Sequence, residues 1–379
     1  MKNKVLFITV VDMYDKNGNG GVKGSQRNLD LIENYFGKEN VVLVTFPRKE
    51  YTIPPKGAIT FNRTQNNFEH LIAALFGCKV YLPWYEKKIF SFIKRQKVDC
   101  LFIDSSMLGR MAKIKDRFKT IVFFHNVEAE YAYNKVKNEG LRFLPSYWAS
   151  QKNEKMAMKY ADSVVCLNER DRRDLEKLYK RTADYVLPVT LKDQFNEDEC
   201  KSLKIQDNKI LFVGAYMPQN IFSIEWFISN VMLKLPGLTL DIVGKGFEKK
   251  KQEYAKYKNV NVIGEVDDLG EYYYSHKIVV LPIQYGAGMK IKTAEAMMYG
   301  RKIIASDEAL EGYEVDSIAD IIRCNKPEEY IEAILKINNS SDDKFGNYSK
   351  QVRERFLDCY ETQNLYSRFS DYMDNLLKK

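Results

Sequence analysis

The feature that most constrains the fold is a regular alternation of short apolar runs with amphipathic stretches. Residues 5–10 form a continuous apolar run, which is typical of a strand buried on both faces, and residues 25–35 follow with apolar positions at helical spacing. The same succession recurs, and further strands are predicted at 41–46, 100–103, 120–124 and 164–167. Strands that alternate with helices predict an α/β fold with a parallel sheet.

The alternation stops between residues 187 and 208 and then starts again. Pro188 precedes a polar run at 192–204 that has no apolar period, which indicates a linker. After it, strands are predicted at 210–213, 238–243, 261–263, 278–281 and 302–305, with helices between them. The sequence therefore predicts two α/β domains in succession, an N-terminal domain at 1–190 and a C-terminal domain at 206–362.

Composition restricts the class of protein further. A chain of 379 residues is long enough for two domains with proper cores. Its six cysteines form no Cys-x-x-Cys pair, so buried free thiols in a reducing cytoplasm are expected rather than a zinc site. The apolar run near the amino terminus lacks a small-residue cleavage site, and no run reaches the roughly 18 apolar residues of a membrane span. The net charge of +8 favours an anionic partner or simply solubility, and no nucleic-acid motif is visible.

The most specific local signal is the segment 282–300, which reads PIQYGAGMKIKTAEAMMYG. A glycine turn at 286–288 leads from a predicted strand into a predicted helix, and Lys290 and Lys292 stand at the helix start. The amino terminus of a helix attracts anions, and open α/β sheets bind ligands at this edge. Glu295 could accept two hydrogen bonds from the vicinal diol of a ribose. The alternative is a glutamate that stabilises the first helical turn, with lysines on a solvated face.

A second signal is His125, one of three histidines in the chain. It follows the predicted strand 120–124, and a side chain at the carboxyl end of a parallel strand points into the ligand crevice. There it could hydrogen-bond a sugar hydroxyl or shuttle a proton. The alternative is a histidine that caps the next helix.

Glycines elsewhere give weaker signals. The loop 18–24 contains Gly20 and Gly21 and could bring backbone N–H groups to a phosphate or sugar, although its spacing is not the dinucleotide-binding one. Gly214 and Gly244 each follow a predicted strand and could allow a phosphate to approach, or could mark simple turns. The sequence has no Asp-x-Asp pair, so a carboxylate clamp for a metal-bound diphosphate is not expected.

Together these segments resemble the retaining glycosyltransferases of the GT-B fold, glycosyltransferase family 4 (glycosyl transferases group 1), over nearly the whole chain. The resemblance implies two Rossmann-like domains whose parallel sheets face a central cleft, with a final helix at about 363–379 that packs back on the first domain. It rests on Gly20-Gly21 with Arg27 beyond, on His125-Asn126-Val127-Glu128, on Phe212-Val213-Gly214 with Pro218 and Asn220, on Ile242-Val243-Gly244-Lys245-Gly246, and on Gly286-Ala287-Gly288-Met289-Lys290 with Lys292 and Glu295.

The resemblance also implies roles for individual residues. Glu295 would hold the donor ribose, and His125 would contact the donor sugar near its reacting carbon. The segment Val262 to Val266 would line the base pocket. The donor diphosphate or sugar would be held by the backbone at Gly288 and Met289, with Gly20, Gly21, Gly214 and Gly244 close to the donor.

The chain departs from the family pattern at two places. Ala287 stands where many members carry the first glutamate of a Glu-x7-Glu motif, and Ala215 and Gln219 stand where many carry an arginine and a lysine. Lys290 or Lys292 would therefore supply the charge opposite the diphosphate.

The sequence thus predicts a retaining, metal-independent hexosyltransferase that uses a nucleotide-diphosphate sugar and no cofactor. A glycan or lipid-linked glycan acceptor in bacterial surface polysaccharide biosynthesis is expected. The expected location is the cytoplasm, with residues 84–97 and 131–148 either resting on an anionic membrane surface or forming ordinary helix faces. Two alternatives stay open: a nucleotide-sugar epimerase or hydrolase, and a protein that binds nucleotide sugar without turnover.

Overall fold

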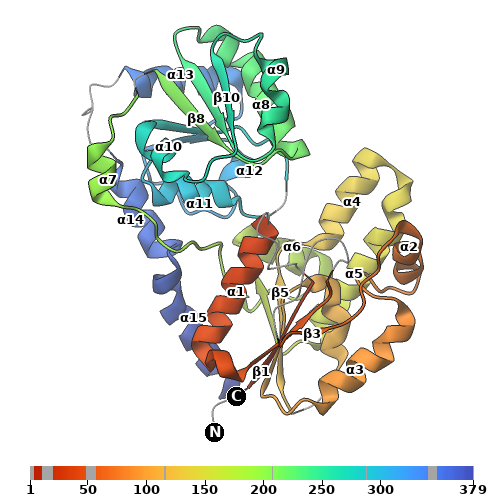
Figure 1. Cartoon of the computed structure of the whole chain (residues 1–379). Coiled ribbons are helices and arrows are strands. Elements are labelled where there is room, and N and C mark those ends of the chain that lie inside the picture. The colour runs from red at the N-terminus through yellow and green to blue at the C-terminus, as the bar shows by residue number, and fades with distance from the viewer. Residues whose placement is uncertain are drawn as a thin grey trace. The chain divides into compact units, whose positions relative to one another are not determined.

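The chain divides into two compact units, shown in the computed structural model of Figure 1. The structure describes residues 4–10, 20–47, 57–114, 117–206, 208–286, 288–339 and 348–378. The first unit comprises Met1–Pro188 with Tyr366–Lys379, and the second comprises Val189–Leu365. Each unit is built around one parallel sheet.

The first unit holds a seven-stranded sheet in the order β3-β2-β1-β4-β5-β6-β7. All of its strand pairs are parallel. The order reverses between β1 and β4, which makes their carboxyl ends the topological switch point of this sheet. The strands are β1 (Val5–Thr9), β2 (Val41–Thr45), β3 (Ile59–Thr60), β4 (Cys100–Ile103), β5 (Lys119–Phe124), β6 (Ser163–Cys166) and β7 (Tyr185–Val186).

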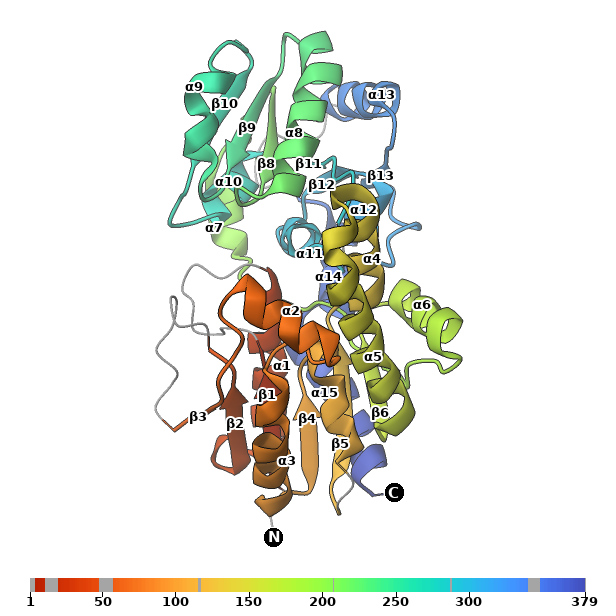
Figure 2. The ribbon, with the colours of Figure 1, turned by 90° about the vertical axis from the view of Figure 1, so that its right-hand side faces the viewer.

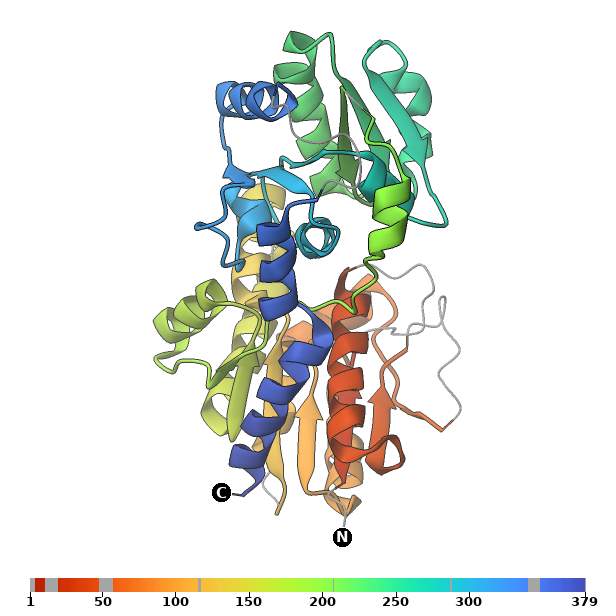
Figure 3. The ribbon, with the colours of Figure 1, turned by 90° about the vertical axis from the view of Figure 1, so that its left-hand side faces the viewer.

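Helices cover both faces of this sheet. Figures 2 and 3, which view opposite sides, show α2, α3 and α5 over one face and α1 and α15 over the other. The last helix is held there by a hydrogen bond from the Tyr366 hydroxyl to the Asn34 carbonyl (2.9 Å) and by Tyr372, which stacks on Tyr185. The helices are α1 (Gly20–Phe36), α2 (Asn67–Leu75), α3 (Glu86–Arg95), α4 (Glu128–Glu139), α5 (Leu144–Tyr160), α6 (Glu169–Tyr179) and α15 (Thr362–Leu377).

The second unit holds a six-stranded parallel sheet in the order β10-β9-β8-β11-β12-β13. Its switch point lies between β8 and β11. The strands are β8 (Lys209–Val213), β9 (Thr239–Val243), β10 (Val260–Gly264), β11 (Ile278–Leu281), β12 (Lys302–Ala305) and β13 (Ile321–Arg323). The helices are α7 (Glu197–Ser202), α8 (Pro218–Asn230), α9 (Lys251–Tyr254), α10 (Gly270–Ser275), α11 (Ile291–Met298), α12 (Asp307–Leu310), α13 (Pro327–Asn338) and α14 (Lys350–Cys359).

The predicted α/β class and the parallel sheets are confirmed. Every strand predicted from an apolar run is present, because residues buried on both faces need a continuous apolar sequence. The short edge strands β3, β7 and β13 were not predicted. All six cysteines are free, and five of them are buried, as expected.

The glycine loop was predicted wrongly at its carboxyl end. Gly20 and Gly21 form the first turn of α1 instead of a loop, and Gly18 lies outside the described residues. The apolar period of the helix extends back to Val22, which is buried on the same side as Leu29 and Ile32. Packing of this face against the sheet therefore outweighs the low helix propensity of the glycines.

The described residues contain no helix that combines the length and the apolar character needed to cross a bilayer. Within the same ranges, no three His, Cys, Asp or Glu side chains are grouped so that they could hold a metal ion.

Candidate functional site

The carboxyl edge of the second sheet gathers the predicted donor-site residues of this unit. Gly214 follows β8, Gly244 follows β9 and Val266 follows β10, while Gly288 and Met289 lie between β11 and α11. Because all strands of the sheet are parallel, these segments emerge at one edge. Gly288 has a φ of 65°, a left-handed conformation that glycine adopts most readily, and the Met289 side chain is buried.

Three of the loops at this edge lie backbone against backbone. The Gly214 N–H donates to the Val243 carbonyl (2.9 Å), and the Gly244 N–H donates to the Gly264 carbonyl (2.7 Å). Gly244 has a φ of 147°, and a Cβ there would lie 2.0 Å from the Gly214 carbonyl oxygen. A side chain at position 244 would therefore push the first two loops apart.

We expect Gly244→Ala to destabilise the second unit by about 2 kcal/mol or more, because its methyl group would overlap a backbone oxygen at an unfavourable φ. Urea unfolding measures the change. Gly237→Ala is the matched control, because no heavy atom lies within 4 Å of a Cβ at that position. Equal unfolding midpoints for the two variants would contradict the close packing of these loops.

Lys292 lies where β8 ends. Its Nζ donates to Asn220 Oδ1 (2.5 Å), lies 5.0 Å from the centre of the Phe212 ring, and would be 2.9 Å from a Cβ at Gly214. Burial lowers the pKa of Lys292 to about 7, against the opposing effect of the Glu295 carboxylate. Lys292 is therefore a partly desolvated amine whose hydrogen-bond acceptor is a neutral amide.

Lys290 has a different environment. Its Nζ donates to Glu308 Oε1 (2.6 Å) and to the Gly288 carbonyl (2.6 Å), so a carboxylate already compensates its charge. The two lysines, which the sequence could not distinguish, thus differ in their counter-charge. Lys292 is the better candidate to face an anionic ligand.

Glu295 lies three residues after Lys292 on α11, so the two side chains share one face of the helix. Tyr273 and Tyr299 stack on each other next to it, with ring centroids 4.7 Å apart. Burial, followed by the nearby Glu295 carboxylate, raises the pKa of Tyr273 well above its ordinary value. This face of α11 therefore presents a carboxylate and an amine at the switch point of the sheet.

The first unit places His125 directly after β5, also at a carboxyl edge. Its Nε2 lies 3.2 Å from Asp104 Oδ1 and 3.3 Å from Ser25 Oγ. Gly24 of α1 lies against the other side of the ring, where a Cβ would be 3.4 Å from Nδ1. Gly20 and Gly21 lie one turn earlier in the same helix.

The structure decides against the alternative that His125 caps the next helix. The first N–H groups of α4 are bound by the buried Glu154 of α5, whose carboxylate accepts from Glu128 (2.6 Å) and Ala129 (3.3 Å). The residue at the N-cap position, Val127, makes no side-chain bond to the helix. His125 is therefore not needed for the helix terminus.

Sequence reasoning missed the residues around His125. Asp104 follows β4 as His125 follows β5, so the same positional signal was present in the sequence. Ser25 and Asn28 gave no signal, because their place on the buried face of α1 depends on where that helix starts.

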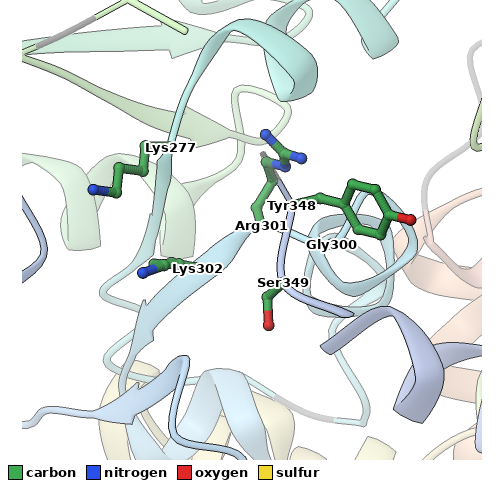
Figure 4. A pocket seen from close by; sticks show the side chains of 6 residues that line it. All are labelled: Lys277, Gly300, Arg301, Lys302, Tyr348 and Ser349. Carbon is green, nitrogen blue, oxygen red and sulfur yellow. The ribbon is translucent and has the colours of Figure 1, made fainter. Parts of the chain in front are cut away.

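A small hollow in the second unit lies away from these residues. Figure 4 shows its lining by Lys277, Gly300, Arg301, Lys302, Tyr348 and Ser349. It lies where β12 begins, at the amino edge of the sheet, opposite the edge that carries Lys292. Arg301 is buried there and donates to the Tyr299 carbonyl (2.8 Å), which is a structural contact.

Comparisons with known proteins agree with this architecture. Residues 207–340 match the family model Glycosyl transferases group 1. Sucrose-phosphate synthase from Thermosynechococcus elongatus superposes with a TM-score of 0.73 at 15% identity, over 99% of each chain. Alr3699/HepE of Anabaena, in complex with UDP, superposes with a TM-score of 0.69 at 13% identity, over 98% of this chain and 100% of that chain. TarM superposes with a TM-score of 0.67 at 12% identity, over 100% of this chain and 99% of that chain.

The chain has the GT-B fold. The family match and this fold together support a glycosyltransferase enzyme. The match includes Gly214, Gly244, Lys292 and Glu295, whereas His125 lies outside the matched residues. Among curated proteins, none matches this sequence.

Proposed function

We propose that this GT-B protein transfers a hexose from a nucleotide-diphosphate sugar to a hydroxyl of a glycan, with retention of the anomeric configuration. The observation that carries the proposal is the Lys292 amine at the end of β8, whose hydrogen-bond acceptor is an amide. A diphosphate would provide an anionic acceptor for the Lys292 amine, and Glu295 on the same helix face would bind the ribose. The structures of Anabaena HepE with UDP and with UDP-glucose support a donor of this class.

Charge stabilisation of the leaving group is the main catalytic effect we infer. As the bond to the sugar breaks, negative charge develops on the diphosphate, and Lys292 and the N–H groups at the start of α11 would stabilise it. The sugar would pass through an oxocarbenium-like state, with the acceptor hydroxyl held close to the reacting carbon. We propose that no metal is required, because a lysine and a helix terminus replace the carboxylate clamp that the sequence lacks.

The acceptor we propose is a lipid-linked glycan of a surface polysaccharide, reached at an anionic membrane face. Support comes from exposed apolar side chains of α2, where Phe68 is 71% and Leu75 is 64% exposed. Trp148 of α5 is also exposed, and Lys152 and Lys155 continue its face of that helix. Figure 2 shows both helices on one side of the sheet.

Vesicle binding tests this acceptor proposal. We expect the protein to co-sediment with phosphatidylglycerol vesicles and not with phosphatidylcholine vesicles.

Two successive measurements test the proposed function. A thermal-shift panel of nucleoside diphosphates is expected to show stabilisation by at least one of them. Donor consumption is then followed with and without glycan acceptors, and NMR of the product gives the anomeric configuration. Consumption without acceptor would indicate a hydrolase, a changed donor sugar would indicate an epimerase, and binding without turnover would leave a nucleotide-sugar-binding protein.

A further inference from the structure

A buried carboxylate lies at the switch point of the first sheet. Asp104 follows β4 and is fully buried. Its Oδ2 accepts from the Thr9 hydroxyl (3.1 Å), and its Oδ1 accepts from Asn28 Nδ2 (2.6 Å). His125 Nε2 lies 3.2 Å from the same Oδ1. A carboxylate without access to water is retained where such bonds stabilise it.

A buried arginine lies near this carboxylate. Arg27 of α1 is buried, donates to the Pro188 carbonyl and lies 5.7 Å from the Phe123 ring. Burial lowers the pKa of Arg27 to about 10, and the attraction of Asp104 acts in the opposite direction. Both oxygens of Asp104 act as hydrogen-bond acceptors, one toward Thr9 and one toward Asn28.

The contact to Asp104 has a consequence for the histidine ring. Asn28 Nδ2 can only donate, so Asp104 Oδ1 is an acceptor, and the hydrogen of a neutral His125 ring is expected on the Nε2 that faces it. Nδ1 then carries a lone pair. In the part of the chain that the structure describes, no hydrogen-bond donor reaches Nδ1, and the residue beside it is Gly24, which has no side chain.

We propose that Asp104 is a positioning residue, which fixes His125 in the Nε2–H tautomer so that Nδ1 accepts a hydrogen bond from a substrate hydroxyl. The identity of that hydroxyl as a sugar's rests on the proposed function, whereas the tautomer does not. The substrate hydroxyl donates to Nδ1, and no covalent bond forms or breaks at Asp104.

The tautomer can be measured without any turnover. Long-range ¹H–¹⁵N correlation spectra of the full chain report which ring nitrogen is protonated, and His125→Gln assigns the signals because the chain has three histidines. We expect hydrogen on Nε2 alone at pH 8 in the wild type and a mixture of tautomers in Asp104→Ala. A ring protonated on Nδ1 in the wild type, or an unchanged tautomer in the variant, would overturn the proposal.

Thr9→Val is the matched control for the spectra. It removes the bond to Asp104 Oδ2, keeps the shape of the side chain and leaves Oδ1 with His125. We expect the Nε2–H tautomer to persist in this variant. Its loss would show that any disturbance of the buried cluster changes the ring, which would remove the specific role of Asp104.

Turnover gives the second readout. We expect Asp104→Ala and His125→Ala each to lower kcat by tenfold or more, with the KM for the donor changed less than threefold. The double variant should be no slower than His125→Ala, because Asp104 acts through the ring. A double variant slowed by the product of the two single effects would assign Asp104 a separate structural role. A chain without turnover would refute the proposed function, and the spectra would still test the tautomer.

Discussion

Lys292→Met should lower kcat/KM for the nucleotide-sugar donor by roughly 100- to 1,000-fold, the effect of losing one preorganised group that stabilises developing negative charge. Methionine has a similar length, but it lacks the charged Nζ that lies over the Phe212 ring. Initial rates over a range of donor concentrations measure the effect. The fold should tolerate the change, because a partly desolvated amine is replaced by an apolar side chain.

Lys290→Met is the matched control for this prediction. The two lysines are two residues apart, but Glu308 already compensates the charge of Lys290. We expect its replacement to change kcat/KM less than tenfold. If Lys290→Met instead caused the larger loss, Lys290 would be the diphosphate ligand and Glu308 would have to release it on binding.

The lowered pKa of Lys292 also predicts a pH dependence of binding. With a pKa of about 7, the amine of the free protein loses its proton as the pH rises above 7. A bound diphosphate favours the cation, so binding above pH 7 should take up a proton, and affinity should fall by up to tenfold per pH unit. Calorimetry in buffers of different ionisation enthalpy measures this uptake, which should be absent in Lys292→Met.

The lowered pKa of Lys292 also makes the stability of the folded chain depend on pH. The pKa of an unfolded lysine is about 10.4, so between pH 7 and that value the unfolded chain binds a proton that the folded chain has lost. The contribution of Lys292 to stability therefore rises with pH across this window. Lys292→Met should flatten this part of the stability curve, and a curve of unchanged slope would indicate an ordinary lysine pKa.

The second large effect is expected at Glu295. Glu295→Ala should weaken donor binding by more than tenfold, because a carboxylate that accepts two hydrogen bonds from a ribose diol would be lost. Calorimetric titration with the nucleoside diphosphate identified by thermal shift measures the change. The helix itself should persist, since alanine has the highest helix propensity.

A deoxyribose ligand provides the control for this assignment. The wild type should bind the 2′-deoxynucleoside diphosphate more weakly than the ribonucleotide, whereas Glu295→Ala should bind both with similar affinity. Unchanged affinity of Glu295→Ala for the ribonucleotide would remove Glu295 from the binding site. An equal preference for ribose in both proteins would assign ribose recognition to another residue.

The local sequence determined the class of fold and part of the candidate site. Strands such as β1, β4 and β11 are buried on both faces, so their residues have to be apolar without interruption. The glycine turn before α11 was visible because Gly288 occupies a backbone conformation that other residues avoid. His125 was visible because a polar residue directly follows an apolar strand. Each of these signals lies within a few consecutive residues.

The tertiary structure alone decided which polar side chains meet. Lys290 and Lys292 look alike in sequence, and they differ because the fold brings Glu308 to one and the amide of Asn220, 72 residues away, to the other. Asp104 meets His125 because β4 and β5 are neighbours in the sheet. The start of α1 was likewise set by packing of Val22 and not by the local glycines. Periodicity is a local property of a chain, whereas the partner of a charge depends on which distant segments the sheet order places side by side.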